Sequence, residues 1–119
     1  MKTILFVSGS LRAASASTAT ARALGVRISD VATSEFGNIG NLPHYNADLD
    51  KVPGVDQWIE QLRTADGVVF VTPEYNYSIP GVLKNAIDWA SRPAFESVFK
   101  DKNCFVISVS GGALGGVRA

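Results

Sequence analysis

The apolar residues of this chain gather in short continuous runs separated by polar and glycine-rich stretches. Three of these runs, at residues 3–8, 67–72 and 104–109, contain no charged side chain. Uninterrupted runs of this length are typical of strands in a parallel sheet, which are buried on both faces. Residues 26–31 instead alternate apolar and polar side chains, which predicts a fourth strand at an edge of the sheet.

Helical periodicity marks three further segments, at residues 15–24, 55–65 and 79–91. The first segment is rich in alanine, opens with serines that can cap a helix, and is followed by Gly25 as a stop signal. The third segment contains Pro80, which suits the first turn of a helix, and follows Ser78, which can cap it. In the second and third segments the apolar residues share one face, which we expect to pack against the sheet.

Strands and helices alternate along the chain, which predicts an α/β fold with a doubly wound parallel sheet in one domain, residues 1–119. Residues 34–53 are rich in Gly, Asn, Asp and Pro and predict a long loop. The chain ends in a glycine-rich stretch at 111–119, where another helix would follow. We therefore expect a C-terminally incomplete fold in which the apolar strand at 104–109 is left as an open edge.

Composition narrows the class of protein. Hydrophobic residues make up 46% and charged residues 18%, values typical of a soluble globular protein. The 11 acidic and 11 basic residues balance, so nothing points to nucleic acid or a membrane surface as partner. The apolar runs are too short to cross a bilayer, and a cytoplasmic location is expected. Cys104 is the only cysteine, so the chain cannot form an intrachain disulfide. Its apolar neighbours predict that it is a buried core residue.

The most informative segment is Pro-Glu-Tyr-Asn-Tyr-Ser-Ile-Pro-Gly at residues 73–81. It follows a predicted strand, and open parallel sheets bind ligands just past the carboxyl ends of their strands. Its tyrosines, amide, carboxylate and prolines form a stiff, aromatic and polar surface that suits a flat heteroaromatic ring. On the residues alone, an ordinary strand-to-helix turn remains the alternative.

Two more strand ends carry candidate ligand groups. The segment at 8–18 leads into the first predicted helix, whose N-terminus offers free N–H groups to an anion. It also carries a positive charge at Arg12 and hydroxyl groups at Ser10, Ser15, Ser17 and Thr18. These groups indicate a phosphate site, and a serine-rich helix cap without a ligand is the alternative. Ser110, Gly111 and Gly112 follow the last strand, where glycines let the backbone approach a ligand closely, or simply form a flexible loop.

No group of residues indicates acid–base or metal chemistry. The only histidine, His44, is expected to be a solvated loop residue, and there is no cysteine pair for a metal site. Glu74 and Asp88 are not spaced as a catalytic pair. A site that offers binding groups but no nucleophile of its own points to a cofactor that carries the chemistry, so we assign no catalytic side chain.

These segments resemble the NADPH-dependent FMN reductase family. The resemblance rests on residues 9–12, 42–49, 73–89 and 115–119, and runs through the whole chain. It implies a flavodoxin-like sheet with strand order 2-1-3-4, whose fifth strand and last helices are missing from this chain.

The resemblance also implies where FMN binds. The family's phosphate loop corresponds to Ser10, Arg12, Ser15, Ser17 and Thr18. The loop beside the isoalloxazine ring corresponds to Pro73, Glu74, Tyr75, Asn76, Tyr77 and Ser78, and the third flavin loop to Ser110, Gly111 and Gly112. Many relatives have a glycine near Ala14, an aromatic residue at Ala16 and an asparagine at Ser17, so weaker phosphate contacts are expected here.

The activity implied by the resemblance is electron transfer from NAD(P)H, through bound FMN, to quinones or similar small acceptors, with ping-pong kinetics. Relatives pair through the helix after Pro80, which implies a homodimer or homotetramer. Trp89 then faces either a partner or the protein core. Two alternatives to an active enzyme remain open: a module that binds FMN, and a truncated product with little or no turnover.

Overall fold

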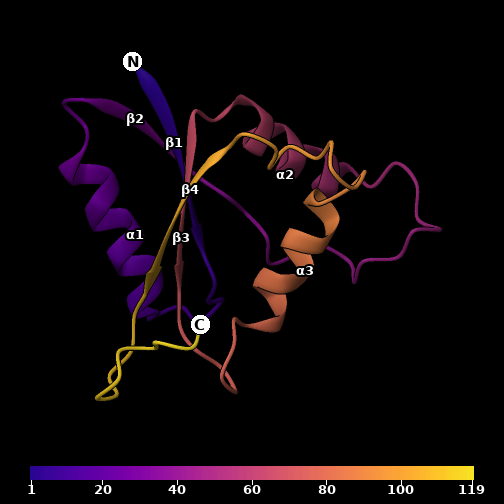
Figure 1. The fold of residues 1–119 in the computed structure, drawn as a ribbon. Helices are drawn as coiled ribbons and strands as arrows, with labels where there is room; N and C mark the ends of the chain where they lie inside the picture. The colour runs from indigo at the N-terminus through magenta and orange to yellow at the C-terminus, as the bar shows by residue number, and fades with distance from the viewer.

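The computed structural model describes residues 1–119 as one four-stranded parallel sheet with helices on both faces (Figure 1). The strands are β1 (Lys2–Ser8), β2 (Ala32–Phe36), β3 (Gly67–Thr72) and β4 (Asn103–Ser108). The helices are α1 (Ala16–Arg27), α2 (Pro53–Thr64) and α3 (Gly81–Ala90). The strand order is β2-β1-β3-β4 and every pair is parallel, which confirms the predicted order.

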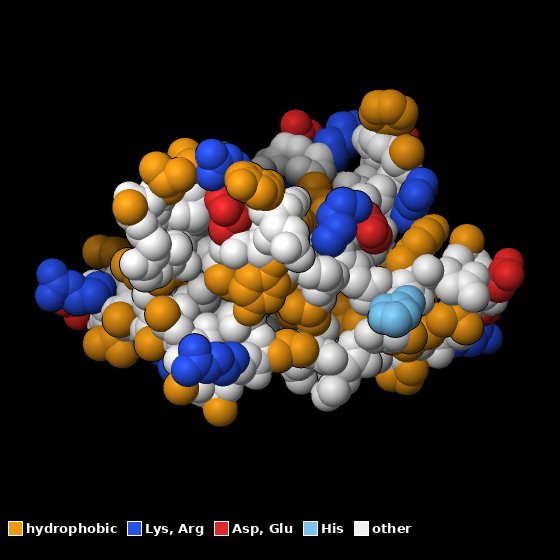
Figure 2. Space-filling view, turned by 90° about the horizontal axis from the view of Figure 1, so that it is seen from below, with side chains coloured by type: hydrophobic (Ala, Val, Ile, Leu, Met, Phe, Trp, Pro, Cys, Tyr) orange, Lys and Arg blue, Asp and Glu red, His pale blue; other side chains and the backbone are white.

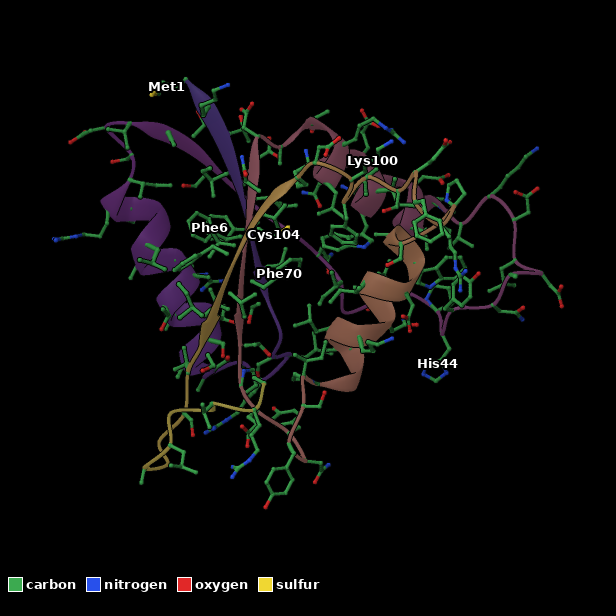
Figure 3. The ribbon with its side chains drawn as sticks, in the orientation of Figure 1. Met1, Phe6, His44, Phe70, Lys100 and Cys104 are labelled. Atoms are coloured by element: carbon green, nitrogen blue, oxygen red, sulfur yellow. The ribbon has the colours of Figure 1, made fainter.

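The sheet separates two apolar layers of unequal size. Helix α1 lies on one face, and α2 and α3 lie on the other (Figure 1). Phe6 and Phe70 come from adjacent strands but point to opposite faces (Figure 3). The larger core, on the side of α2 and α3, contains Phe70 with Trp58 and Leu83, whereas Phe6 joins a small cluster beside α1.

The predicted inner faces of α2 and α3 are confirmed. Trp58 and Leu62 of α2 and Leu83 and Ala86 of α3 are at most 1% exposed. The predicted start of α3 is wrong, because this helix begins at Gly81 and has no side-chain cap. Ser78 does not cap it, since the residue at the N-cap position is Pro80, and Ser78 instead closes the preceding turn through backbone bonds with Tyr75.

The strand predicted at 26–31 is also wrong. Helix α1 continues to Arg27, and β2 forms at Ala32–Phe36, so its last three residues fall in the segment predicted as a loop. Gly25 explains the difference, because it is buried inside α1 against β2. A Cβ atom at this position would lie 3.0 Å from Cζ of Phe36 and 3.2 Å from Oγ of Ser34. The glycine allows helix and strand to pack closely and does not end the helix.

Strand β4 is the open edge that the sequence predicts, but Cys104 on it is exposed, so the predicted core position is wrong. The reason is that no element lies beyond β4, and its apolar side chains stay in contact with solvent. Phe105 is 64% exposed and Val106 is 58% exposed. Beside them, an entirely apolar groove of about 260 Å³ runs along the face shared with α1.

The long loop after β2 is fastened to α3. Asn85 accepts a hydrogen bond from the backbone N–H of Tyr45 at 2.7 Å and donates to the carbonyl of Pro43 at 2.9 Å. Trp89 is 8% exposed, and its ring meets that of Tyr45 edge to face. Trp89 therefore packs within this chain, on the loop. His44, next to these anchors, is exposed (Figure 3).

Candidate functional site

The loops that leave β1, β3 and β4 meet at one end of the sheet, at the bottom of the view in Figure 1. They enclose an open cavity of about 260 Å³, which we call the strand-end cavity. Its lining consists of Ser10, Arg12, Ser15, Ala16, Ser17, Pro73, Glu74, Tyr75, Val109, Ser110 and Gly111. Open parallel sheets bind ligands at this end, where the order of connections reverses between adjacent strands.

Gly9 brings the first loop against the end of β3. Its backbone N–H donates to the carbonyl of Val71 at 2.8 Å. A Cβ atom on Gly9 would lie 2.5 Å from Oγ1 of Thr72, which is inside van der Waals contact. The position therefore requires glycine, and this close approach fixes Ser10 and Arg12 relative to the loop that follows β3.

The N-terminus of α1 forms one wall of the cavity. Ser15 caps the helix, and its hydroxyl oxygen accepts a hydrogen bond from the N–H of Thr18 at 3.2 Å. The backbone N–H groups of Ala16 and Ser17 make no hydrogen bond within the chain. Arg12 is exposed nearby and has no carboxylate partner. Free N–H groups, the helix dipole and a guanidinium together suit an anion.

The wall that follows β3 is a tight two-residue turn. The N–H of Tyr75 donates to the carbonyl of Ser78 at 2.9 Å, and the N–H of Ser78 donates back at 3.1 Å. Between them, Asn76 and Tyr77 have φ values of 53° and 66°, the left-handed conformations of a type I′ turn. Asparagine tolerates this region, whereas tyrosine adopts it rarely. The turn leaves Tyr75 in the cavity lining and Tyr77 69% exposed.

The third wall continues β4. The N–H of Val109 donates to the carbonyl of Thr72 at 2.9 Å, so the backbone pairing with β3 extends past the strand. The Ser110 hydroxyl oxygen then accepts from the N–H of Gly112 at 3.0 Å, which turns the chain away from the sheet. Ser110 and Gly111 are exposed on this side of the cavity.

The structure brings together most of the residues that the sequence singles out. The cavity lining includes Ser10, Arg12, Ser15, Ser17, Pro73, Glu74, Tyr75, Ser110 and Gly111. It does not include Thr18, Asn76, Tyr77, Ser78 or Gly112. The Thr18 hydroxyl is instead paired with that of Ser8 at 2.8 Å. Both line a second cavity, of about 330 Å³, on the β2 side of the first loop.

Sequence reasoning missed Ala16 and Val109 as lining residues. Neither has a polar side chain, so no chemical signal marks them. Ala16 could have been found as the first residue after the Ser15 cap, because its free N–H faces the cavity end of α1. Val109 could have been found from its position directly after the last strand.

Charged side chains at this end do not form a catalytic pair. Lys, Arg, Asp and Glu side chains are scattered over this face among hydrophobic and uncharged atoms (Figure 2). The Glu74 carboxylate accepts a hydrogen bond from the backbone N–H of Arg118 at 2.6 Å. No group of His, Cys, Asp or Glu side chains is placed to hold a metal ion. None of the helices has the length and apolar character needed to span a membrane.

Comparison with solved structures identifies the class of fold. The flavoenzyme NAD(P)H:(acceptor) oxidoreductase FerB from Paracoccus denitrificans superposes with a TM-score of 0.94 at 38% sequence identity. The match covers 100% of this chain and 66% of the FerB chain. The four-stranded parallel sheet with its three helices therefore has the flavodoxin-like fold.

Sequence comparison then shows the family. The family model described as NADPH-dependent FMN reductase matches residues 1–119, and the chain belongs to this family. It is 43% identical over 120 residues to an NAD(P)H-dependent FMN reductase of Pseudomonas aeruginosa, covering 98% of this chain. It is 46% identical over 114 residues to a 2-hydroxy-1,4-benzoquinone reductase of a Burkholderia species, covering 94%. The chain spans 64% and 62% of the lengths of these two relatives.

Proposed function

We propose that this chain is an FMN-dependent oxidoreductase that passes electrons from NAD(P)H, through FMN, to a quinone or a similar small acceptor. One observation carries the proposal: three strand-end loops converge on one cavity with anion donors on one wall and an aromatic turn on another. Membership of the FMN reductase family supports FMN as the ligand and NAD(P)H as the co-substrate.

The residues at the N-terminus of α1 fit the phosphate of FMN. The free N–H groups of Ala16 and Ser17 supply donors, and the hydroxyls of Ser10 and Ser17 add two more. Arg12 supplies the positive charge, and it forms no ion pair with an acidic side chain of this chain. Charge-assisted hydrogen bonds of this kind are the strong ones, so this wall is where most of the cofactor's affinity originates.

The residues after β3 fit the ring of the cofactor. Pro73, Glu74 and Tyr75 line the cavity, and the backbone at this turn offers hydrogen-bonding groups at fixed positions. When bound, FMN supplies the two-electron chemistry that no side chain here provides. The role of the chain is to hold the ring with one side accessible, so that NAD(P)H and the acceptor bind there in turn.

The assembly that we propose is a homodimer or homotetramer. The support is a groove of about 290 Å³ between α2, α3 and the loop before α2. Leu49 on its rim is 42% exposed, and Trp89 lines it. The groove combines apolar side chains with charged ones of both signs, a mixture that suits contact with a second copy, and the exposed side of α3 beside it carries the Lys84–Asp88 pair at 2.5 Å.

A module that binds FMN without efficient turnover is the second candidate. It is favoured by the exposure of the third wall, since Ser110 and Gly111 follow the open-edge strand β4 and are both exposed. A cavity open on this side would bind the phosphate yet leave the acceptor loosely held.

Flavin binding by the purified protein tests the proposal. We expect a visible flavin band to remain after gel filtration with FMN, and NADPH oxidation to depend on an added quinone. Arg12→Ala should weaken FMN binding about tenfold or more, equivalent to ~1.4 kcal/mol, and leave riboflavin binding unchanged. Arg27→Ala, at the far end of α1, is the matched control and should change neither.

Three outcomes separate the candidates. Retained flavin with quinone-dependent oxidation supports the enzyme. Retained flavin without oxidation supports the binding module. Loss of FMN and riboflavin alike from the wild-type protein contradicts both.

A further inference from the structure

The last residues of the chain fold back onto the turn that follows β3. We call residues 115–119 the C-terminal tail. The Ser108 hydroxyl donates to the carbonyl of Gly115 at 2.6 Å, at the start of the tail. The backbone N–H of Arg118 donates to Oε1 of Glu74 at 2.6 Å. The Arg118 guanidinium carbon lies 4.7 Å from the centre of the Tyr77 ring, within cation–π distance.

The path of the tail depends on two glycines. Gly115 and Gly116 have φ values of 61° and 74°, the left-handed region that favours glycine. Gly116 is buried, and a Cβ atom there would lie 3.2 Å from Cβ and Oγ of Ser108. Replacing it would push the tail away from the sheet. The backbone therefore directs Arg118 toward the turn.

The turn has a reason to need support. Tyr77 adopts a left-handed conformation that a bulky residue rarely holds, and such strain persists only where the surroundings enforce it. Its side chain is 69% exposed, so the core does not hold it. The guanidinium of Arg118 contacts the Tyr77 ring from outside the turn. Residues 76 and 77 in turn fix the spacing of Tyr75, which lines the strand-end cavity.

We propose that Arg118 is a positioning residue that holds the turn at residues 75–78 in the shape that binds the flavin ring. The inference rests on the proposed function for the identity of the ligand. The Arg118 side chain acts through the Tyr77 ring and is itself outside the cavity lining, whereas the bond to Glu74 comes from the Arg118 backbone N–H and is kept in any substitution that retains that N–H. Its loss therefore weakens binding of the ring and spares binding of the phosphate.

Binding of FMN and of riboflavin, which lacks the phosphate, separates an effect on the ring from an effect on the phosphate. Arg118→Ala should weaken FMN and riboflavin equally, about two- to fivefold, the range that a cation–π contact at an exposed site supplies. Arg118→Lys should retain much of the affinity because it keeps the cation. Val117→Ala is the matched control, since Val117 is 69% exposed on the same tail. Equal affinity of Arg118→Ala and wild type for both flavins would overturn the proposal, and so would a loss confined to FMN.

A double-mutant cycle tests the route through Tyr77. Tyr77→Gly removes the ring and suits the left-handed backbone. In that background, adding Arg118→Ala should have no further effect on riboflavin affinity. A full additional loss in the double variant would mean that Arg118 acts elsewhere.

Amide hydrogen exchange makes the test independent of flavin binding. In the unliganded protein, the Ser78 N–H should exchange several-fold faster in Arg118→Ala than in wild type or Val117→Ala. An exchange rate of the Ser78 N–H that is the same in Arg118→Ala and wild type would contradict the inference. If the wild-type protein binds no flavin but Ser78 responds as expected, the proposed ligand is wrong and the positioning contact stands.

Discussion

Trp89 donates its indole N–H to the backbone carbonyl of Pro43 at 2.7 Å, across 46 residues of sequence. The same carbonyl also accepts from the side chain of Asn85, so one oxygen fastens the long loop to two positions on α3. The Arg92 guanidinium lies 5.4 Å from the centre of the neighbouring Tyr45 ring. A segment without regular structure is thus held by side chains of the helix that follows the candidate site.

Replacing Asn85 should detach this loop. Asn85→Ala removes both of its hydrogen bonds and leaves the N–H of Tyr45 without its acceptor. We expect the free energy of unfolding to fall by about 1–3 kcal/mol, measured by urea denaturation. Lys84→Ala on the exposed side of the same helix is the control and should change it by no more than about 1 kcal/mol. Equal effects of the two variants would mean that the loop contributes nothing to stability.

A methyl group at Gly9 should disturb both stability and binding. The added Cβ would meet Oγ1 of Thr72 at 2.5 Å, so the first loop must shift away from β3. We expect Gly9→Ala to lower the free energy of unfolding by about 1–3 kcal/mol and to weaken FMN binding. Gly81→Ala is the control, because nothing lies within 4 Å of that position. It should be neutral or stabilising by up to about 1 kcal/mol.

Asp66 should make stability depend on pH in the acid range. Its carboxylate accepts a hydrogen bond from the backbone N–H of Thr3 at 2.8 Å, and Lys2 lies 3.5 Å away. The hydrogen bond from Thr3 is the main reason that the Asp66 pKa lies below its ordinary value of 3.8, and the positive charge of Lys2 lowers this pKa further. The unfolded chain therefore takes up this proton at a higher pH than the folded one.

It follows that the contribution of Asp66 is complete above pH 3.8 and is lost as the pH falls through the lowered pKa. Asp66→Asn should be less stable than wild type at neutral pH, and the difference should shrink in acid. Asp30→Asn, at an exposed site without an ion pair, is the control. A difference between Asp66→Asn and wild type that stays constant with pH would contradict this assignment.

Cys104 should react with a thiol reagent in the native protein, because its side chain is exposed at the sheet edge. Partial burial of the thiol raises its pKa above the ordinary value of 9.0. Labelling should therefore be complete without denaturant, slower than in the unfolded chain near neutral pH, and faster as the pH rises. Labelling that begins only on unfolding would show that another chain or segment covers β4.

Sequence reasoning succeeded where one chain segment decides its own structure. The apolar runs of β1 and β3 predict buried strands, and both are central strands of the sheet with a helix layer on each face. The helix faces of Trp58 and Leu83 follow from periodicity alone. The groups of the strand-end cavity were found because each follows a strand, and parallel strands deliver their ends to the same edge.

It failed where structure depends on a partner distant in sequence. Gly25 reads as a helix stop, and only the close approach of Phe36 and Ser34 shows that it is a packing position. Cys104 was predicted to be a buried core residue, because an apolar run does not reveal whether another element covers its strand. The Tyr77 conformation was also missed, because a type I′ turn usually has glycine at that position.

The position of β4 at the edge has a consequence for the lifetime of a bound ligand. Strands β1 and β3 each have two neighbours, whereas β4 pairs only with β3. Local opening requires least free energy at such an edge. Local opening of β4 alone would move Ser110 and Gly111 away from the strand-end cavity, while Arg12 and Tyr75 stay in place. We therefore expect the bound ligand to dissociate after β4 opens, and its contacts with the N-terminus of α1 to break last.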